Sequence, residues 1–332
     1  MREVRLAAHP QDTAALEHFD VVETTTPEPQ DGQILVRNLW MSVDPCMRAQ
    51  MNRGVANLPG FQVGEPLHRG AIGAVIDSRT DDQEKGDVVL HRKGWRTHAV
   101  LDAHHATKVD AHAVPPQAYL GVLGTTGFTA YLGLARETGV PPGETVFLSG
   151  AAGAVGSTAG QLARHLGAGR VIGSTGDPDK ARWLTDELGF DAAINYREGP
   201  VSEQLAEAAP EGIDLFFDNV GGEHLEAALG AMNYRGRIAL CGQISTYDTG
   251  EPPTGPRNLV EASLRCISIH GFQITSSEQR ALVPEFIAEV APMVASGALK
   301  HRETVYDGLH QAPEALLGLF TGKNTGKMLV RL

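Results

Sequence analysis

An apolar run that leads directly into small residues constrains this chain more than any other feature. Residues 145–149 are typical of a buried strand, residues 150–153 are glycine or alanine, and a helical pattern covers Val155–Leu166. A turn without bulky side chains lets the backbone approach a phosphate, and the amides at the helix start favour an anion. We expect the pyrophosphate contacts to be Gly153, Ala154, Val155 and Gly156, although the same small residues would also suit tight packing alone.

Strand-like and helical segments alternate from about residue 145 to residue 272. This alternation is typical of a doubly wound parallel sheet with helices on both faces, an α/β architecture known as the Rossmann fold. The six strand candidates are Thr145–Ser149, Val171–Thr175, Ala192–Tyr196, Ile213–Asp218, Arg237–Cys241 and Cys266–Phe272. Six strands are enough for a complete dinucleotide-binding sheet.

The first 120 residues and the tail have a different pattern. Glycine and proline break the N-terminal part into short strand-like pieces, which predicts a compact, largely antiparallel β domain. The pieces are Ile34–Trp40, Gly70–Asp77, Asp87–His91 and Trp95–Val100. After a helix expected at Leu282–Ser296, a strand candidate at Lys327–Leu332 would return to this first domain. Two domains also agree with a length of 332 residues.

Charge and composition exclude several classes of partner. The net charge of −12 would repel nucleic acid and an anionic membrane surface. No apolar run is long enough to span a bilayer, and the N-terminus does not resemble a secretory signal, so we expect a cytoplasmic protein. The three cysteines are odd in number and widely spaced, and we expect them to be reduced thiols.

Seven ordered segments together carry a resemblance to a known family. They are 41–48 (MSVDPCMR), 127–131 (GFTAY), 150–157, 189–196, 217–222 (FDNVGG), 241–247 (CGQISTY) and 321–327 (TGKNTGK). The chain resembles the medium-chain dehydrogenase/reductase superfamily, and within it the zinc-free NADPH-dependent alkenal double-bond reductases. The resemblance implies a Rossmann NADPH-binding domain at 123–299, inserted in a mainly β GroES-like catalytic domain of residues 1–122 plus 300–332.

Two positions depart from this family's pattern. The family commonly has an aromatic residue where this chain has Cys46, and often a proline where it has Thr126. In such a fold both positions would lie near the substrate cleft. They therefore bear on substrate preference more than on the type of reaction.

The residues do not supply the ligands of a zinc site. Cys46 and His68 occur near where two ligands of a catalytic zinc would be expected, but no cysteine or histidine lies between His112 and His165 to provide the third. A structural zinc would need four clustered cysteines. The adjacent pair His104 and His105 lacks helical ligand spacing. We therefore expect no metal.

The end of the second strand candidate bears on the choice of cofactor. An acidic residue there favours NAD, whereas NADP needs positive charge for its 2′-phosphate. Asp177 is the one acidic candidate, but its place before Pro178 favours a helix cap. Lys180 is unfavourable against the helix dipole unless a phosphate balances it, although it could also be a surface lysine. The resemblance implies that Lys180 and Tyr196 contact the 2′-phosphate, and NADPH is favoured.

Further cofactor contacts are expected at the carboxyl ends of the later strands. Asn219 follows the fourth strand candidate, where ligands bind in open α/β sheets, although it could instead be an ordinary turn residue. The resemblance adds contacts to the cofactor. The expected residues are Asn219, Gly242, Ile244, Ser245, Phe272, Gln273 and Asn324.

The predicted reaction is metal-independent hydride transfer from NADPH to the C=C bond of a small α,β-unsaturated aldehyde or ketone. Tyr247 is the candidate catalytic residue, because a phenol can donate a hydrogen bond to a developing enolate oxygen, although it could instead only line the pocket. Two other functions stay open: an NADPH-dependent quinone reductase of the same superfamily and a catalytically silent NADPH-binding protein. The resemblance also implies a homodimer, in which Cys266–Phe272 would pair with its counterpart.

Overall fold

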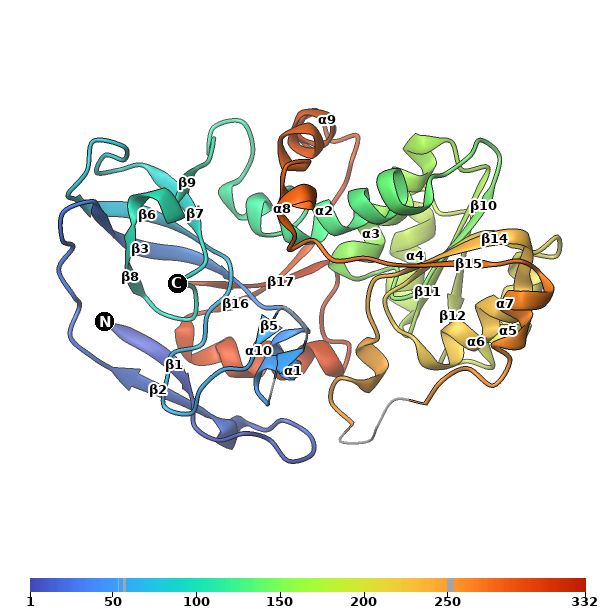
Figure 1. Cartoon of the computed structure of the whole chain (residues 1–332), viewed down its shortest axis with the longest axis horizontal. Coiled ribbons are helices and arrows are strands. Elements are labelled where there is room, and N and C mark those ends of the chain that lie inside the picture. The colour runs from blue at the N-terminus through green and yellow to red at the C-terminus, as the bar shows by residue number, and fades with distance from the viewer. Residues whose placement is uncertain (53, 56–57, 250–253) are drawn as a thin grey trace. The chain divides into compact units, whose positions relative to one another are not determined.

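The computed structural model describes residues 1–332 except 53, 56–57 and 250–253. The chain divides into two compact units (Figure 1). Unit 1 consists of Met1–Gly124 and Glu303–Leu332, and unit 2 consists of Thr125–Arg302. In the described parts of the chain, no helix has the length and apolar character needed to cross a membrane.

Unit 2 contains the predicted parallel sheet. Its strands are β10 (Thr145–Leu148), β11 (Arg170–Thr175), β12 (Ala192–Asn195), β13 (Ile213–Asp218), β14 (Met232–Leu240) and β15 (Ser268–Gly271). They are all parallel and lie in the order β12-β11-β10-β13-β14-β15. The order reverses direction between β10 and β13, which is the switch point where ligands bind in such sheets. The predicted Rossmann architecture is thus confirmed.

Helices cover both faces of this sheet. The helices of unit 2 are α2 (Thr125–Tyr131), α3 (Ala154–Leu166), α4 (Pro178–Asp186), α5 (Val201–Ala208), α6 (Gly222–Ala231), α7 (Val260–Leu264), α8 (Ser277–Arg280) and α9 (Val283–Ala295). Phe147 and Phe216 stack at 5.1 Å between ring centroids and belong to the core that α5 and α6 cover. The next residue along β13, Phe217, points to the other face, where it meets Phe272 edge-on.

Unit 1 is a mainly antiparallel β structure. Its long strands are β3 (Gln33–Ser42), β6 (Ala71–Ser78), β7 (Val88–His91), β8 (His98–Asp102), β16 (Glu303–Asp307) and β17 (Lys327–Arg331). Shorter elements are β1 (Arg2–Leu6), β2 (Phe19–Glu23), β4 (Gly54–Val55), β5 (Leu58–Pro59), β9 (Thr107–Lys108), α1 (Met47–Gln50) and α10 (Ala312–Phe320). The tail strand β17 pairs antiparallel with β3, so the predicted return of the chain to its first domain is confirmed.

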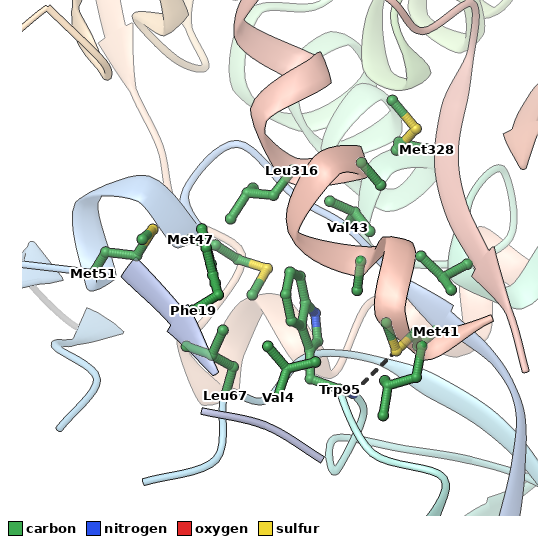
Figure 2. Close-up of a cluster of buried hydrophobic side chains, with 14 of the residues drawn as sticks. Val4, Phe19, Met41, Val43, Met47, Met51, Leu67, Trp95, Leu316 and Met328 are labelled. Atoms are coloured by element: carbon green, nitrogen blue, oxygen red, sulfur yellow. Dashed lines mark hydrogen bonds between the residues drawn. The ribbon is translucent and has the colours of Figure 1, made fainter. Parts of the chain in front are cut away.

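Trp95 lies at the centre of the core of unit 1. Its side chain is fully buried, and its indole N–H donates to the Ser42 carbonyl at 3.2 Å. Figure 2 shows Met41, Met47 and Leu316 around it. The sequence predicted a strand at Trp95–Val100, but β8 begins only at His98. The reason is local, because Trp95 has a φ of 60°, which an extended strand cannot accommodate.

Candidate functional site

The turn between β10 and α3 has the geometry of an anion site. A Cβ on Gly156 would lie 2.5 Å from the Gly150 carbonyl oxygen and 2.6 Å from the Ala151 Cα, so only glycine allows this close approach. Helix α3 begins with Gly153 as its N-cap, without a side-chain cap and without an acidic residue in its first turn. Its first amides and its dipole are therefore suited to a phosphate group. Gly153, Ala154, Val155 and Gly156 all lie at this helix start.

A buried network joins the carboxyl ends of β10 and β13. The Ser149 hydroxyl donates to Asp218 Oδ1 at 2.8 Å and accepts the Asn219 N–H at 2.8 Å. The Asn219 side-chain amide donates to the Ser149 carbonyl at 2.8 Å. Asp218 Oδ1 also accepts the N–H groups of Val220 and Gly221, both at 2.9 Å. These bonds hold Asn219 at the switch point of the sheet.

Asp218 is a buried carboxyl group with an incomplete set of partners. Its Oδ2 atom is buried and accepts no hydrogen bond from the residues that the structure describes. Burial raises the pKa of Asp218 above its ordinary value, while the hydrogen bonds from Gly221, Val220 and Ser149 oppose that effect. The sequence reasoning did not single out Ser149 or Asp218 as functional, because their roles depend on a contact across 69 residues.

The loop after β14 is fastened to the loop after β13. The Gly242 N–H donates to the Asp218 carbonyl at 3.0 Å, and the Ile244 N–H donates to the Asn219 carbonyl at 3.1 Å. The Ser245 N–H and Oγ both donate to the Val220 carbonyl, at 3.3 and 2.5 Å. Gly242, Ile244 and Ser245 therefore lie beside Asn219.

The side chain of Tyr247 contacts the backbone of its own loop. Its hydroxyl oxygen accepts the Gln243 N–H at 3.2 Å, and a Cβ on Gly242 would lie 3.2 Å from that oxygen. The absence of a side chain at Gly242 thus allows the phenol to lie over the backbone. The structure brings Tyr247 close to the Gly242 and Gln243 backbone of the same strand end.

The end of β11 carries polar and basic side chains. Asp177 caps α4, because its Oδ1 accepts the N–H groups of Asp179 at 2.9 Å and Lys180 at 3.1 Å. The predicted cap is therefore confirmed. Burial lowers the pKa of Lys180, and the positive charge of Arg197 lowers it further, while Asp177 opposes both effects. Lys180 and Arg197 thus act electrostatically on each other, and an anion bound beside them would be stabilised by both positive charges.

Tyr196 is held at the same strand end. Its ring packs over Gly176, where a Cβ would lie 2.5 Å from Cζ, and the Arg197 guanidinium lies 5.9 Å from the ring centroid. His224 meets the ring edge-on at 5.4 Å and shares a 2.8 Å hydrogen bond with the Ser174 hydroxyl. The sequence reasoning missed Arg197, although its position directly after Tyr196 was a usable signal.

The remaining predicted contacts have different surroundings. Phe272 lies just beyond β15, with its ring 6.2 Å from that of Phe217, and Gln273 beside it is exposed. Asn324 belongs to unit 1, in the loop between α10 and β17, where its side-chain amide donates to the Gly326 carbonyl at 2.9 Å.

The two residues considered as zinc ligands have other neighbours. The Cys46 sulfur accepts a hydrogen bond from Arg69 Nη2, and the exposed His68 ring meets Phe61 edge-on at 5.0 Å. Within the described residues, the one cluster of three potential metal ligands is the surface group Asp102, His104 and His105. Cys46 and His68 are not part of it.

Comparisons with known proteins agree with this geometry. The family model described as "N-terminal domain of oxidoreductase" matches residues 2–109, and the one described as "Zinc-binding dehydrogenase" matches residues 154–289. The NADPH-dependent curcumin reductase of Escherichia coli (strain K12) is 36% identical over 332 residues, which cover 98% of this chain and 95% of that protein. The 2-alkenal reductase (NADP(+)-dependent) of Nicotiana tabacum is 38% identical over 300 residues, which cover 90% of this chain and 86% of that protein.

A solved structure extends the similarity to three dimensions. The crystal structure of CurA in complex with NADPH from Vibrio vulnificus matches with a TM-score of 0.94 and 34% identity, and the match covers 100% of this chain and 99% of that one. Similarity at this level and over the full length shows common family membership, as the seven sequence motifs predicted. The chain therefore belongs to the medium-chain dehydrogenase/reductase family, together with the curcumin and 2-alkenal reductases.

Proposed function

We propose that this protein is an NADPH-dependent reductase of the C=C bond in α,β-unsaturated aldehydes or ketones. The observation that carries the proposal is the end of β11, where Lys180 and Arg197 offer positive charge and Asp177 is committed to capping α4. This arrangement suits the 2′-phosphate of NADPH, and the cap occupies Oδ1 of Asp177, the acidic residue that would otherwise be the candidate for the ribose hydroxyls of NADH. The relatives named above are reductases that use the same nucleotide.

The remaining nucleotide contacts follow from the same sheet edge. The uncapped start of α3 would hold the pyrophosphate, with Gly156 allowing its close approach. Tyr196 and Lys180 would contact the 2′-phosphate. The other proposed contacts are Asn219, Gly242, Ile244, Ser245, Phe272, Gln273 and Asn324. NADPH supplies a hydride to the β-carbon of the acceptor.

Tyr247 is the residue that we propose for the polar step. Its O–H would donate a hydrogen bond to the carbonyl oxygen of the acceptor as negative charge develops there. The Gln243 N–H donates to the same phenol oxygen at 3.2 Å, and such a bond strengthens the phenol as a donor. Addition of hydride to the β-carbon would leave an enolate, and its α-carbon would take a proton from Tyr247 or from solvent.

We propose that the reaction needs no metal ion. The available donors do not form a three-ligand site, because Cys46 accepts a hydrogen bond from Arg69 and the chain has no cysteine or histidine from 113 to 164. A hydrogen-bond donor such as Tyr247 would then take the place of a Lewis acid.

We also propose that the protein is located in the cytoplasm.

We propose further that the protein is a homodimer built on β15. This strand is one edge of the six-stranded sheet, and exposed apolar side chains lie on it, on its neighbour β14 and in the 259–264 segment that precedes it in the chain. They are Tyr234 (67% exposed), Leu259 (53%), Val260 (61%), Leu264 (68%) and Ile269 (42%). A second copy that pairs β15 with β15 would cover these side chains and satisfy the open backbone edge.

An acceptor screen tests the reaction. The purified protein is incubated with NADPH or NADH and with a 2-alkenal, an aliphatic enone or a simple quinone, and the products are identified by mass spectrometry. We expect NADPH-dependent conversion of the alkenal and the enone to the saturated carbonyl compounds, in the presence of a chelator. Quinone reduction alone would favour the quinone reductase, and no oxidation of NADPH would favour a silent binding protein.

A further inference from the structure

The end of β8 carries three side chains whose ligand atoms lie close together. Asp102 is the last residue of the strand, and His104 and His105 belong to the single 3₁₀ turn, Ala103–His105, that follows it. One ligand atom from each of the three side chains lies within 4.8 Å of the other two. The imidazole centroids are 3.9 Å apart, and His105 Nδ1 lies 3.8 Å from Asp102 Oδ2. Two imidazoles and a carboxylate are typical ligands of divalent transition metals.

Buried neighbours hold the turn that presents the two imidazoles. Ala103 and Ala106, on either side of the histidines, are buried in an apolar core of unit 1, whereas His104 and His105 are exposed. The buried Gln83 side-chain amide donates to the carbonyls of both alanines, at 3.1 and 3.3 Å. The Ala106 N–H also donates to the Ala103 carbonyl at 3.0 Å. The backbone that carries both imidazoles is therefore fixed.

A second contact orients the Asp102 carboxylate. Asp102 is the N-cap residue of the 3₁₀ turn, where an aspartate commonly accepts a backbone N–H, but its side chain makes no capping hydrogen bond to the residues that the structure describes. Its Oδ1 instead accepts the side-chain amide of Gln33, its partner in the β3–β8 pairing, at 3.0 Å. Gln33 Oε1 in turn accepts the Gln30 N–H at 3.1 Å. Carboxylates that bind metals are commonly positioned by hydrogen bonds of this kind.

Small side-chain rotations would bring the three ligand atoms to the spacing of a metal site. Ligand atoms of a tetrahedral Zn²⁺ bound at about 2.0–2.1 Å lie roughly 3.4 Å from one another. The side chains of His105 and Asp102 are 66% and 49% exposed, so packing does not oppose such rotations. Besides the two histidines, Lys93 acts electrostatically on Asp102, and its ammonium donates to the Val100 carbonyl at 2.6 Å. An ion that enters from solvent thus meets one opposing charge.

We propose that Asp102, His104 and His105 form a binding site for a divalent transition-metal ion of the Zn²⁺ type. Two imidazole nitrogens and one carboxylate oxygen hold the ion, and water takes the fourth position. The adjacent histidines lack helical ligand spacing, but a strand end followed by a 3₁₀ turn brings the ligands together without it. The site is separate from Cys46 and His68, and it has no part in the proposed reaction. Its test therefore does not depend on the proposed function.

Calorimetric titration of the untagged full-length protein with zinc chloride tests the site. The pH is kept at about 7.5, because metal ligands must be deprotonated. We expect saturable binding of about one Zn²⁺ per chain. His104→Gln, His105→Gln and Asp102→Asn should each weaken binding at least roughly 10-fold, because each removes one of three ligands. No saturable binding by the wild type, or wild-type affinity in these variants, would overturn the proposal.

Two further variants separate a built site from general binding to surface histidines. His112→Gln is the matched control, because His112 is an exposed histidine of unit 1 that also lies near a carboxylate, Asp110. It should keep the wild-type affinity. Gln33→Met removes the hydrogen bond that orients Asp102 and should weaken binding by roughly 10-fold. A loss in His112→Gln as large as that in His104→Gln would refute the site.

Thermal unfolding gives an independent measurement. An ion that binds only the folded chain stabilises it, so Zn²⁺ at roughly 100 times its Kd should raise the Tm of the wild type by about 4 °C. A chelator should reverse this shift, and the double variant His104→Gln/His105→Gln should not show it. An equal shift in the double variant would overturn the proposal, because the ion would then stabilise the fold from another place.

Discussion

The Ser149 hydroxyl donates a hydrogen bond to Asp218 Oδ1 at 2.8 Å and thereby joins the ends of β10 and β13. The same hydroxyl accepts the Asn219 N–H, so one side chain fixes both the buried carboxyl and the residue that follows it. This link lies at the switch point of the sheet, next to the turn proposed to bind the pyrophosphate. The conformation of the nucleotide site therefore depends on Ser149, a residue that need not contact the nucleotide itself.

Replacing Ser149 should damage both stability and cofactor binding. Ser149→Ala removes a donor to Asp218 and an acceptor for the Asn219 N–H, and we expect a loss of about 1–3 kcal/mol in the free energy of unfolding. Urea unfolding followed by circular dichroism measures the loss, and fluorescence titration measures a weaker affinity for NADPH. Ser202→Ala, at an exposed position of α5, is the control. Wild-type stability in Ser149→Ala would contradict the link.

Lys180→Ala should weaken the binding of NADPH without weakening the binding of NADH. The loss of a charge-assisted contact to the 2′-phosphate should raise the Kd for NADPH by roughly 10- to 100-fold and leave the Kd for NADH unchanged. Arg197→Ala should act in the same direction. Calorimetric titration with each nucleotide makes the comparison, with Arg182→Ala, an exposed arginine of the same helix, as the control. An equal loss for both nucleotides would place Lys180 away from the 2′-phosphate.

Tyr247→Phe tests the proposed catalytic hydroxyl. If the phenol donates to the developing oxyanion, its removal should reduce kcat by about 100-fold, while the Kd for NADPH changes little. Steady-state kinetics with an enone measure the effect. Tyr119→Phe, whose hydroxyl bonds to the Asp110 carbonyl at 3.4 Å in unit 1, is the matched control. A Tyr247→Phe variant with full kcat and normal KM would show that the ring only lines the pocket.

A charge near β15, at one edge of the six-stranded sheet of unit 2, should weaken the proposed dimer. Leu264→Glu introduces a carboxylate among exposed apolar side chains, and we expect the dimer Kd to rise by about 30-fold, equivalent to about 2 kcal/mol. Light scattering across a dilution series measures the dimer fraction. Val21→Glu adds the same charge at an exposed apolar residue of unit 1 and should leave the dimer intact. A monomeric wild-type protein would refute the interface.

Two buried histidines should make stability fall in mild acid. Burial lowers the pKa of His91 to about 3 and that of His224 to about 4, from an ordinary value of 6.5. Below pH 6.5 the unfolded chain binds protons at both positions while the folded chain does not. Above pH 6.5 both histidines are neutral in the folded and the unfolded chain, so they do not lower the free energy of unfolding. Between pH 6.5 and 4 the free energy of unfolding should fall by about 1.4 kcal/mol per pH unit for each histidine.

Urea unfolding at a series of pH values between 4 and 7 tests this dependence. His91→Gln and His224→Gln should each reduce its slope by about one proton, although both will lower stability at pH 7. His104→Gln, which changes an exposed histidine, should keep the wild-type slope. Identical slopes in all three variants would show that the buried histidines do not govern the acid response.

The success of the strand predictions in unit 2 has a simple cause. Strands buried on both faces, such as β10 and the Leu215–Phe217 part of β13, are apolar runs, and recognisable helix starts lie between the strands. Unit 1 was harder to predict, because the pairing of β3 with β6 contains register irregularities and because the backbone conformation of Trp95 prevents β8 from starting there. No local sequence pattern indicates a φ of that kind at a tryptophan.

The sequence alone determined the alternation of strands and helices, the small-residue turn, the cap at Asp177 and the family, because each depends on residues that are neighbours in the chain. Only the tertiary structure joined Ser149 to Asp218, placed Arg197 near Lys180 and left Arg69 against Cys46. Those relationships depend on which strands become neighbours and on which charges folding removes from water, and these are properties of the assembled fold rather than of any local segment.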